Sequence, residues 1–196
     1  MKTDFGLQQA LFIGFCASLM IALKSMLRLK LGLSGHSMLL MSFFYLLCHL
    51  VVARPGAMFA CGLLSGLLAM MLGVGKSGVL LLVKFGAPAL AMELMAMLLA
   101  MFGLCHALPG KGSQVNKSLW LRLIFLALAG ALAWGLRDFV AASLAGMDLS
   151  AALLQGGIEF LGGLVFALLG AALVPPVIKR MQAHDLISVS AYEEKP

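Results

Sequence analysis

The chain has 196 residues, of which 62% are hydrophobic and 11% are charged, and its formal net charge is +6. Its mean hydropathy is +1.05, whereas soluble domains are about half apolar and about 25% charged. A soluble fold of this length cannot bury so much apolar surface in one core. The composition therefore excludes a soluble domain, a disordered chain and a secreted disulfide scaffold. It predicts an all-α integral membrane protein whose positive charge faces lipid headgroups, with no nucleic-acid partner.

Six apolar runs are long enough to cross a bilayer, which requires about 20 residues in a helix. In chain order they are Leu7–Leu27, His36–Ala53, Ala57–Val74, Val79–Leu108, Ser118–Met147 and Ala151–Val177. Short stretches with glycine, proline or charged residues separate them. The runs are continuous rather than alternating, which favours helices over a β-barrel. We expect one compact bundle of six transmembrane helices over residues 1–178, followed by a short cytoplasmic tail over 179–196.

The first predicted span has a small residue at every fourth position: Ala10, Gly14, Ser18 and Ala22. Such a stripe lies along one face of a helix and lets a second helix approach closely. The second helix can belong to the same chain or to a partner protein. Internal packing is the more common use of such a stripe.

Four cysteines, Cys16, Cys48, Cys61 and Cys105, lie inside the apolar runs without a CxxC pair. This placement is typical of small buried hydrophobic residues rather than of disulfides or zinc ligands. Two of them precede a histidine, as Cys48-His49 and Cys105-His106, a pairing that would also suit a soft metal. Hydrogen bonding between helices is the more common role of such histidines. We predict no metal and no cofactor.

The most informative residues are the charged residues inside the last three spans. A charged group at bilayer depth is expensive and marks a functional site by default. We measured depth at 1.5 Å per residue from the outer ends of the spans, taking Gly86, before the expected Pro88 kink, as that end of the fourth span. On this scale Glu93 of the fourth span, Arg137 of the fifth and Glu159 of the sixth lie roughly 10–14 Å below the surface. Asp138 follows Arg137, and Gln155 lies one turn before Glu159.

Two interpretations of these charges remain open. One is an outward-facing pocket that binds a small molecule with charged and apolar parts. The other is an ion pair of Arg137 with Glu93 or Glu159 that only holds the helices together. In the pocket interpretation, Arg137 makes the main contact, to an anionic group of the ligand. Gln155 and Glu159 then accept hydrogen bonds from donor groups of the ligand.

Further residues bear on the pocket. An unpaired buried arginine would be costly, so Glu93, Asp138 or Glu159 should hold Arg137 in the empty site. His36 and Lys84, near the outer ends of their spans, either line the pocket or contact lipid headgroups, and for Lys84 headgroup contact is the more ordinary role.

The distribution of lysine and arginine predicts the orientation of the chain. With the N-terminus inside, eight of these residues flank the cytoplasmic side and four flank the outer side, with Lys84 and Arg137 inside spans. Both termini are therefore expected in the cytoplasm of the cell. The cluster of Lys24, Arg28 and Lys30 on the outer side opposes this assignment.

A chain of this size with six predicted helices and no soluble domain resembles the S component of an energy-coupling factor (ECF) transporter. The stripe from Ala10 to Ala22 resembles the A-x-x-x-A motif with which such proteins dock to their T component. The segments Ser34-Gly35-His36 and Ala53-Arg54-Pro55-Gly56-Ala57 also look like S-component sequences. The resemblance implies a substrate site near the outer face, between helices 4 to 6 and the loops that cap them. It also implies partnership with a T component and two ATPase subunits.

We accordingly predict a substrate-capture subunit of an ECF-type importer for a small, micronutrient-like solute, and no enzymatic activity of its own. Residues 73–78 look like part of a P-loop, but Met70 stands where the first glycine belongs and no strand precedes it. Energy must then come from partner ATPases. The alternatives are a standalone channel or facilitator and a membrane enzyme of lipid metabolism.

Overall fold

The computed structural model describes residues 6–27, 36–73, 78, 80–102 and 117–184, which form six helices and no strand. The helices are α1 (Leu7–Leu27), α2 (His36–Val52), α3 (Ala57–Met71), α4 (Leu80–Met101), α5 (Lys117–Leu144) and α6 (Leu149–Ala183). The six predicted helices and the all-α class are confirmed.

Several predicted ends are shifted by a few residues, and two of these shifts have identifiable reasons. The fifth span was expected to reach Met147, but α5 ends at Leu144 because the chain turns at Gly146, which has a φ of 79°. The sixth was expected to end at Val177, but α6 continues to Ala183 through Pro175 and Pro176. Its last turns continue because Ile178 and Met181 pack against the core.

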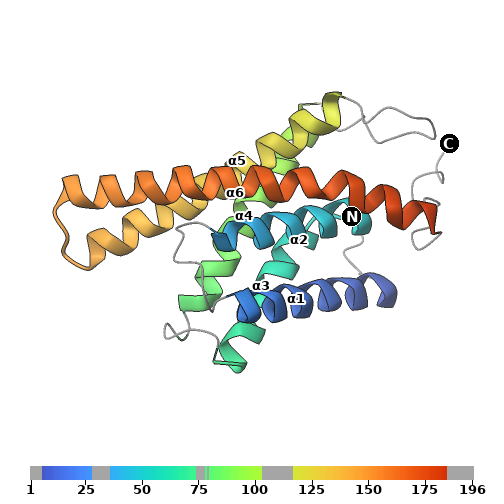
Figure 1. Ribbon diagram of the computed structural model, residues 1–196, viewed down its shortest axis with the longest axis horizontal. Helices are drawn as coiled ribbons and strands as arrows, with labels where there is room; N and C mark the ends of the chain where they lie inside the picture. The colour runs from blue at the N-terminus through green and yellow to red at the C-terminus, as the bar shows by residue number, and fades with distance from the viewer. Residues whose placement is uncertain (1–5, 28–35, 74–77, 79, 103–116, 185–196) are drawn as a thin grey trace.

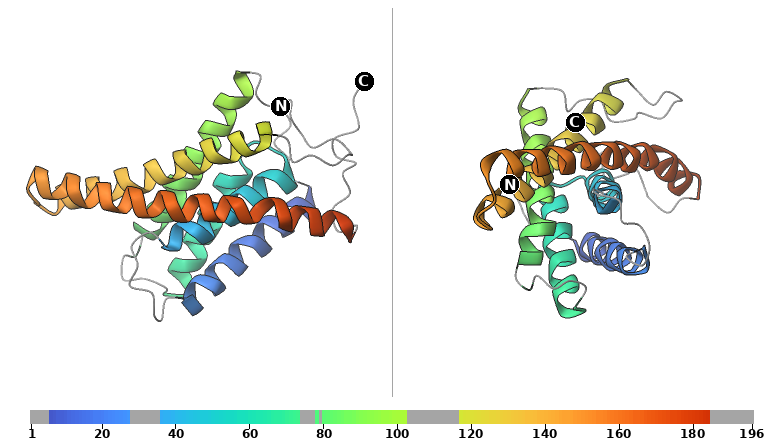
Figure 2. Two further views of the ribbon diagram at one scale, coloured as in Figure 1. Left: turned by 45° about the horizontal axis from the view of Figure 1, so that its top comes forward. Right: turned by 60° about the vertical axis from the view of Figure 1, so that its left-hand side comes forward.

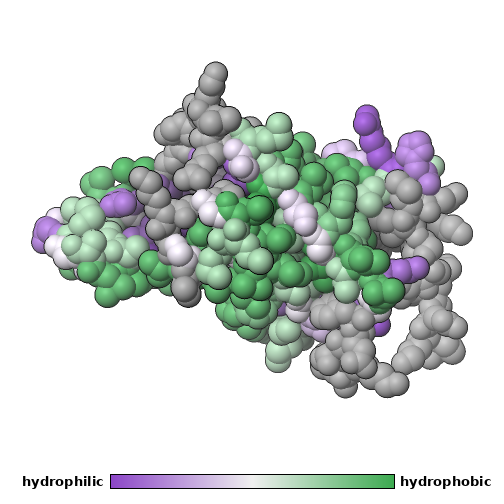
Figure 3. Space-filling view, turned by 90° about the horizontal axis from the view of Figure 1, so that it is seen from below, coloured by the Kyte–Doolittle hydropathy of each residue, from purple (hydrophilic) through white to green (hydrophobic). Residues whose placement is uncertain are grey.

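By length and composition, α1, α4, α5 and α6 are able to cross a membrane, and α2 and α3 are shorter apolar helices. Figure 3 shows a face that is hydrophobic across its middle and hydrophilic at its ends. At 35 residues, α6 is about 50 Å long, well beyond the roughly 30 Å of a hydrocarbon core. An apolar middle of this kind is what a multi-pass membrane protein requires.

The helices form two crossing sets. In Figure 1, α1, α2 and α6 run along the long axis of the molecule, and α3 and α4 run across it. The closest-packed pairs are α5 with α6, α2 with α6 and α3 with α4, while α1 packs on α2 and α3 at the periphery (Figure 2). The joined ends of α5 and α6 project past the other helices on the left of Figure 1.

Glycines permit the closest helix crossings. A Cβ atom on Gly62 of α3 would lie 2.5 Å from the Cβ of Ala89 in α4, and one on Gly170 of α6 would lie 2.5 Å from the carbonyl oxygen of Leu39 in α2. These backbones approach more closely than any side chain permits. The helix pairs α3–α4 and α2–α6 are therefore packed tightly at these positions.

Two buried side chains of α2 tie it to its neighbours. The Tyr45 hydroxyl donates to the carbonyl oxygen of Phe85 in α4 at 2.9 Å, and the Ser42 hydroxyl donates to that of Ala167 in α6 at 2.8 Å. Both bonds satisfy polar groups that have no water available inside the bundle. Together they fix α2 as the centre of the bundle, with α4 and α6 on either side.

Candidate functional site: a tryptophan-centred cluster beside a cavity on α6

The site is organised around Trp134, a buried residue of α5. Its indole Nε1 donates to Oε2 of Glu159 in α6 at 3.1 Å. The ring also faces Gly163 of α6, where an added Cβ would lie 3.3 Å from Trp134 Cδ1. A glycine there gives the indole room between α5 and α6, so Trp134 positions the Glu159 carboxylate.

Two cations face the same indole ring. The Arg137 Cζ atom lies 3.9 Å from the ring centroid and the Lys84 Nζ atom lies 5.6 Å from it, both within cation–π range. Arg137 reaches the ring because residues three apart in a helix share a face. Lys84, on α4, is directed at Trp134 rather than only toward headgroups.

Arg137 has its countercharge in the next residue. Its Nε atom donates to Oδ1 of Asp138 at 3.0 Å, its Nη2 atom donates to the same oxygen, and both side chains are largely buried. The sequence analysis considered Glu93, Asp138 and Glu159 as partners for Arg137. In the structure the partner is Asp138. The alternative of a cross-helix pair with Glu93 or Glu159 is not what is found.

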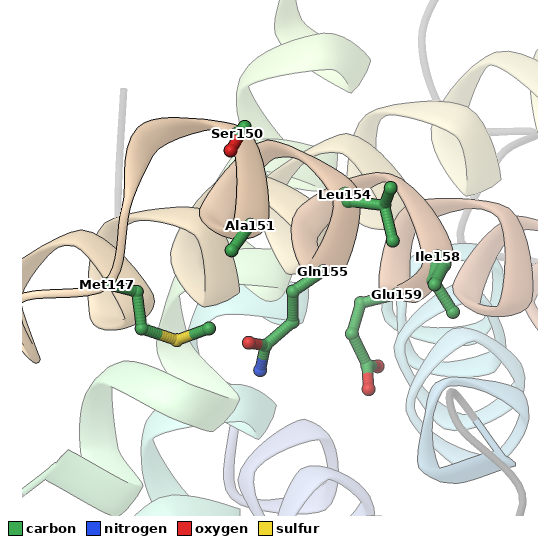
Figure 4. A pocket seen from close by; sticks show the side chains of 7 residues that line it. All are labelled: Met147, Ser150, Ala151, Leu154, Gln155, Ile158 and Glu159. Atoms are coloured by element: carbon green, nitrogen blue, oxygen red, sulfur yellow. The ribbon is translucent and has the colours of Figure 1, made fainter.

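A cavity of about 500 Å³ opens beside this cluster on the projecting end of α6 (Figure 4). Its described lining is Met147, Ser150, Ala151, Leu154, Gln155, Ile158 and Glu159. In Figure 4 the side chains of Gln155 and Glu159 extend from α6 in the same direction, one turn apart. The cavity thus combines one carboxylate, one amide and one hydroxyl with an apolar surface, as small-molecule sites do.

At the start of α6, Asp148 and Ser150 form a polar pair near the cavity. The Ser150 hydroxyl donates to Oδ2 of Asp148 at 2.5 Å. This hydrogen bond favours the ionised form and holds the pKa of Asp148 below its ordinary value. Asp148 is fully exposed, so its charge is directed to solvent and not into the cavity.

The structure places Glu93 apart from the cavity. Its depth was counted from Gly86 as if the helices were parallel, whereas α4 begins at Leu80 and runs across the direction of α1, α2 and α6. Glu93 is buried at the start of α3, where Oε1 accepts from the Gly56 N–H at 2.7 Å and Oε2 from the Met58 N–H at 3.0 Å. The carboxylate therefore caps α3, whose own N-cap residue is a glycine without a capping side chain.

The seven predicted pocket residues thus fall into three groups. Gln155 and Glu159 line the cavity. Arg137 and Lys84 do not line it but contact Trp134, and Asp138 is paired with Arg137. The two residues that lie apart are Glu93, at the start of α3, and His36, the half-buried first residue of α2, which does not line the cavity.

Sequence reasoning missed the central role of Trp134 and also a second buried polar contact. Trp134 could have been found from its spacing, three residues before Arg137 on the same helix. In the second contact, Nη2 of the buried Arg122 lies 2.8 Å from Nε2 of His49. Arginine nitrogens only donate, so His49 Nε2 accepts and its proton is on Nδ1. The contact links α2 to α5 and gives His49 the interhelical hydrogen bond expected of it.

The small-residue stripe of α1 faces outward. Ala10, Ser18 and Ala22 are exposed, and no heavy atom outside the helix lies within 4 Å of a Cβ placed on Gly14. Ser18 and Ala22 also line a groove of about 310 Å³ with Leu68 and Leu72, at the end of α3. Of the two uses considered for the stripe, packing inside this chain is not the one observed.

The three described cysteines, Cys16, Cys48 and Cys61, are buried free thiols in the core, as expected for small hydrophobic residues. Within the described residues, no group of three or more histidine, cysteine, aspartate and glutamate side chains is placed to hold a metal ion. The pair Cys105-His106 lies outside those residues.

Comparison with known proteins connects this fold to one class. No family model and no curated protein matches the chain. A solved structure described as an S-component of an ECF transporter matches with a TM-score of 0.60 at 15% identity, over 95% of this chain and 100% of that one. The chain therefore has the fold of an ECF S component, as its sequence predicted.

Proposed function

We propose that the chain is the substrate-capture subunit of an ECF-type importer. The observation that carries the proposal is the match of the whole six-helix fold to an S component. In this role the chain is not an enzyme. It binds a small, micronutrient-like solute and releases it only in a complex with a T component and two ATPase subunits.

The cavity beside Glu159 is the proposed capture site. Its described lining comes from the first turns of α6 and from Met147 in the turn after α5, in the part of the chain that the S-component resemblance associates with substrate. With both termini in the cytoplasm, as the lysine and arginine distribution predicts, this end of the bundle faces outside. The solute would then enter from the outer side, beside Gln155 and Glu159.

The outward stripe of α1 is the proposed docking surface for the T component. α1 is peripheral, and four small residues along one face leave its backbone open to a second helix. Helices that meet inside a bilayer gain most from close van der Waals contact, which small residues allow. The exposed Leu11 and Phe15, which are 65% and 64% exposed, would add apolar contact beside the stripe.

A substitution of Gly14 tests this proposal. In a strain that co-expresses the chain with a T component and two ATPases, Gly14→Leu should abolish recovery of the complex through a tag on the chain, because the new side chain fills the docking face. The matched control is Gly157→Leu on α6, since a Cβ on Gly157 also meets nothing within 4 Å.

Three results would separate the possibilities. The proposal predicts that the Gly157 variant assembles and the Gly14 variant does not, although both are monodisperse alone. Equal assembly of both variants would remove the docking role of α1. Failure of the wild-type chain to assemble, with ion flux or lipid turnover by the chain alone, would favour a channel or a lipid enzyme.

A further inference from the structure

The cavity on α6 has a distinctive charge arrangement. Glu159 is the one charged residue among its described lining, and the other side chains are apolar except for Gln155 and Ser150. Within the described part of the chain, the one hydrogen bond found for the Glu159 carboxylate comes from Trp134 Nε1. The described salt bridge is elsewhere, between Arg137 and Asp138.

The two neighbouring cations face the Trp134 ring and are not part of the described cavity lining. Arg137 stacks on Trp134 and its Nε and Nη2 atoms both bond Asp138. Lys84 lies over the same ring from α4, and neither residue lines the cavity. Asp138 therefore offsets the positive charge of Arg137, and Glu159 supplies the charge of the described lining, among mostly apolar side chains.

A carboxylate at bilayer depth is stabilised by a positive charge or by several donors. Glu159 has four lone-pair sites, of which the indole N–H uses one. A planar group with two N–H donors and a positive charge fits such a carboxylate with paired hydrogen bonds. Gln155, one turn away on the same face, supplies an amide that both donates and accepts.

We infer that the solute bound in this cavity carries a planar nitrogen cation, such as an amidinium or a protonated nitrogen heterocycle, on an apolar body. Glu159 accepts from the cationic group, Gln155 makes a second polar contact, and Leu154 and Ile158 contact the apolar body. This inference rests on the proposed capture function and assigns the class of its substrate. It replaces the anionic ligand that the sequence predicted from Arg137.

Three small probes of one shape test the charge preference: benzamidine (a cation), benzamide (neutral) and benzoate (an anion). The full chain in detergent, carrying Trp120→Phe, retains Trp134 as its one tryptophan, so quenching of its fluorescence reports binding beside Glu159. Benzamidine should bind about tenfold or more tightly than benzamide, and benzoate should be the weakest.

Two variants connect the preference to Glu159. Glu159→Gln removes the charge and keeps an oxygen that accepts from Trp134. It should lower benzamidine affinity about tenfold and benzamide affinity by a clearly smaller factor, because only benzamidine loses an ion pair. Asp148→Asn neutralises an exposed carboxylate that does not line the cavity. It should change benzamidine affinity less than about twofold, as expected for a screened surface charge.

Several outcomes would overturn the inference: a preference for benzoate, equal affinity for the three probes, no binding of any probe, or benzamidine binding that is insensitive to Glu159→Gln. A preference for benzoate would restore Arg137 as the main ligand contact and leave the capture function standing. The capture function itself fails on a different measurement, the assembly of the wild-type chain with its T component and ATPases.

Discussion

At the scale of single residues, the three intramembrane acids have different tasks. Glu93 caps α3, Asp138 offsets Arg137, and Glu159 faces the cavity from beside Trp134. Carboxylate side chains thus stabilise a helix end, neutralise a cation and offer a ligand contact. The partners of each acid, which decide its task, come from a different helix or from the adjacent residue.

The capping role predicts a stability effect for Glu93→Gln. Both Glu93 oxygens accept from backbone N–H groups, and an amide would place a donor against one of them. We expect a loss of about 1.5–3 kcal/mol in unfolding free energy, the range for a hydrogen bond to a charged group. Denaturant unfolding of the purified chain measures it.

The same substitution at Glu159 is the control, because that side chain accepts from one described donor and an amide oxygen can replace it. Glu159→Gln should unfold close to the wild type. Equal stability of Glu93→Gln and the wild type would contradict the capping role.

At the scale of helices, the sequence predicts which segments are helical but not how they cross. The apolar runs indicate six spans, because each must satisfy its own backbone in lipid. Glu93 does not join Gln155 and Glu159 at the cavity, because depth was counted along parallel helices whereas α4 runs across α6. A crossing angle depends on side-chain packing between segments that are distant in the sequence. It therefore cannot be predicted from a local pattern in residues 79–108.

Part of the candidate site was also predictable. Gln155 and Glu159 are spaced one turn apart on a helix with few polar residues, which predicts that they share a site. The structure places both at the cavity. Trp134 as the shared contact of Arg137, Lys84 and Glu159 depends on α4, α5 and α6 meeting at one point, which requires the fold. The burial of Arg122 against His49 was missed for the same reason.

The close crossing of α2 and α6 predicts that Gly170→Ala destabilises the protein. The new Cβ would lie 2.5 Å from the Leu39 oxygen and 3.2 Å from the Phe43 nitrogen, both backbone atoms of α2 that cannot rotate away. We expect a loss of about 1–3 kcal/mol from overpacking. Denaturant unfolding of the variant in detergent is the measurement.

Gly157→Ala provides the control on the same helix. Its Cβ meets nothing within 4 Å, and alanine favours a helix over glycine by up to about 1 kcal/mol. This variant should be as stable as the wild type or slightly more stable. If Gly170→Ala matched it, the helices would not cross as closely as described.

At the scale of the whole molecule, the proposed importer subunit has one surface for substrate capture and another for docking. The cavity lies on the projecting end of α6, and the small-residue stripe lies on peripheral α1. α1 packs on α2 and α3, and α2 packs on α6, so α2 connects the two surfaces. Capture and docking are thus assigned to separate helices that share one central neighbour.

The most direct test of the capture function is native mass spectrometry of the chain purified alone from its own cells in mild detergent. The account predicts a protein peak carrying one small molecule of defined mass, and loss of that mass increment in Glu159→Gln at unchanged folding. A wild-type chain that carries no small molecule, or one that Glu159→Gln retains equally well, would contradict capture at the cavity on α6.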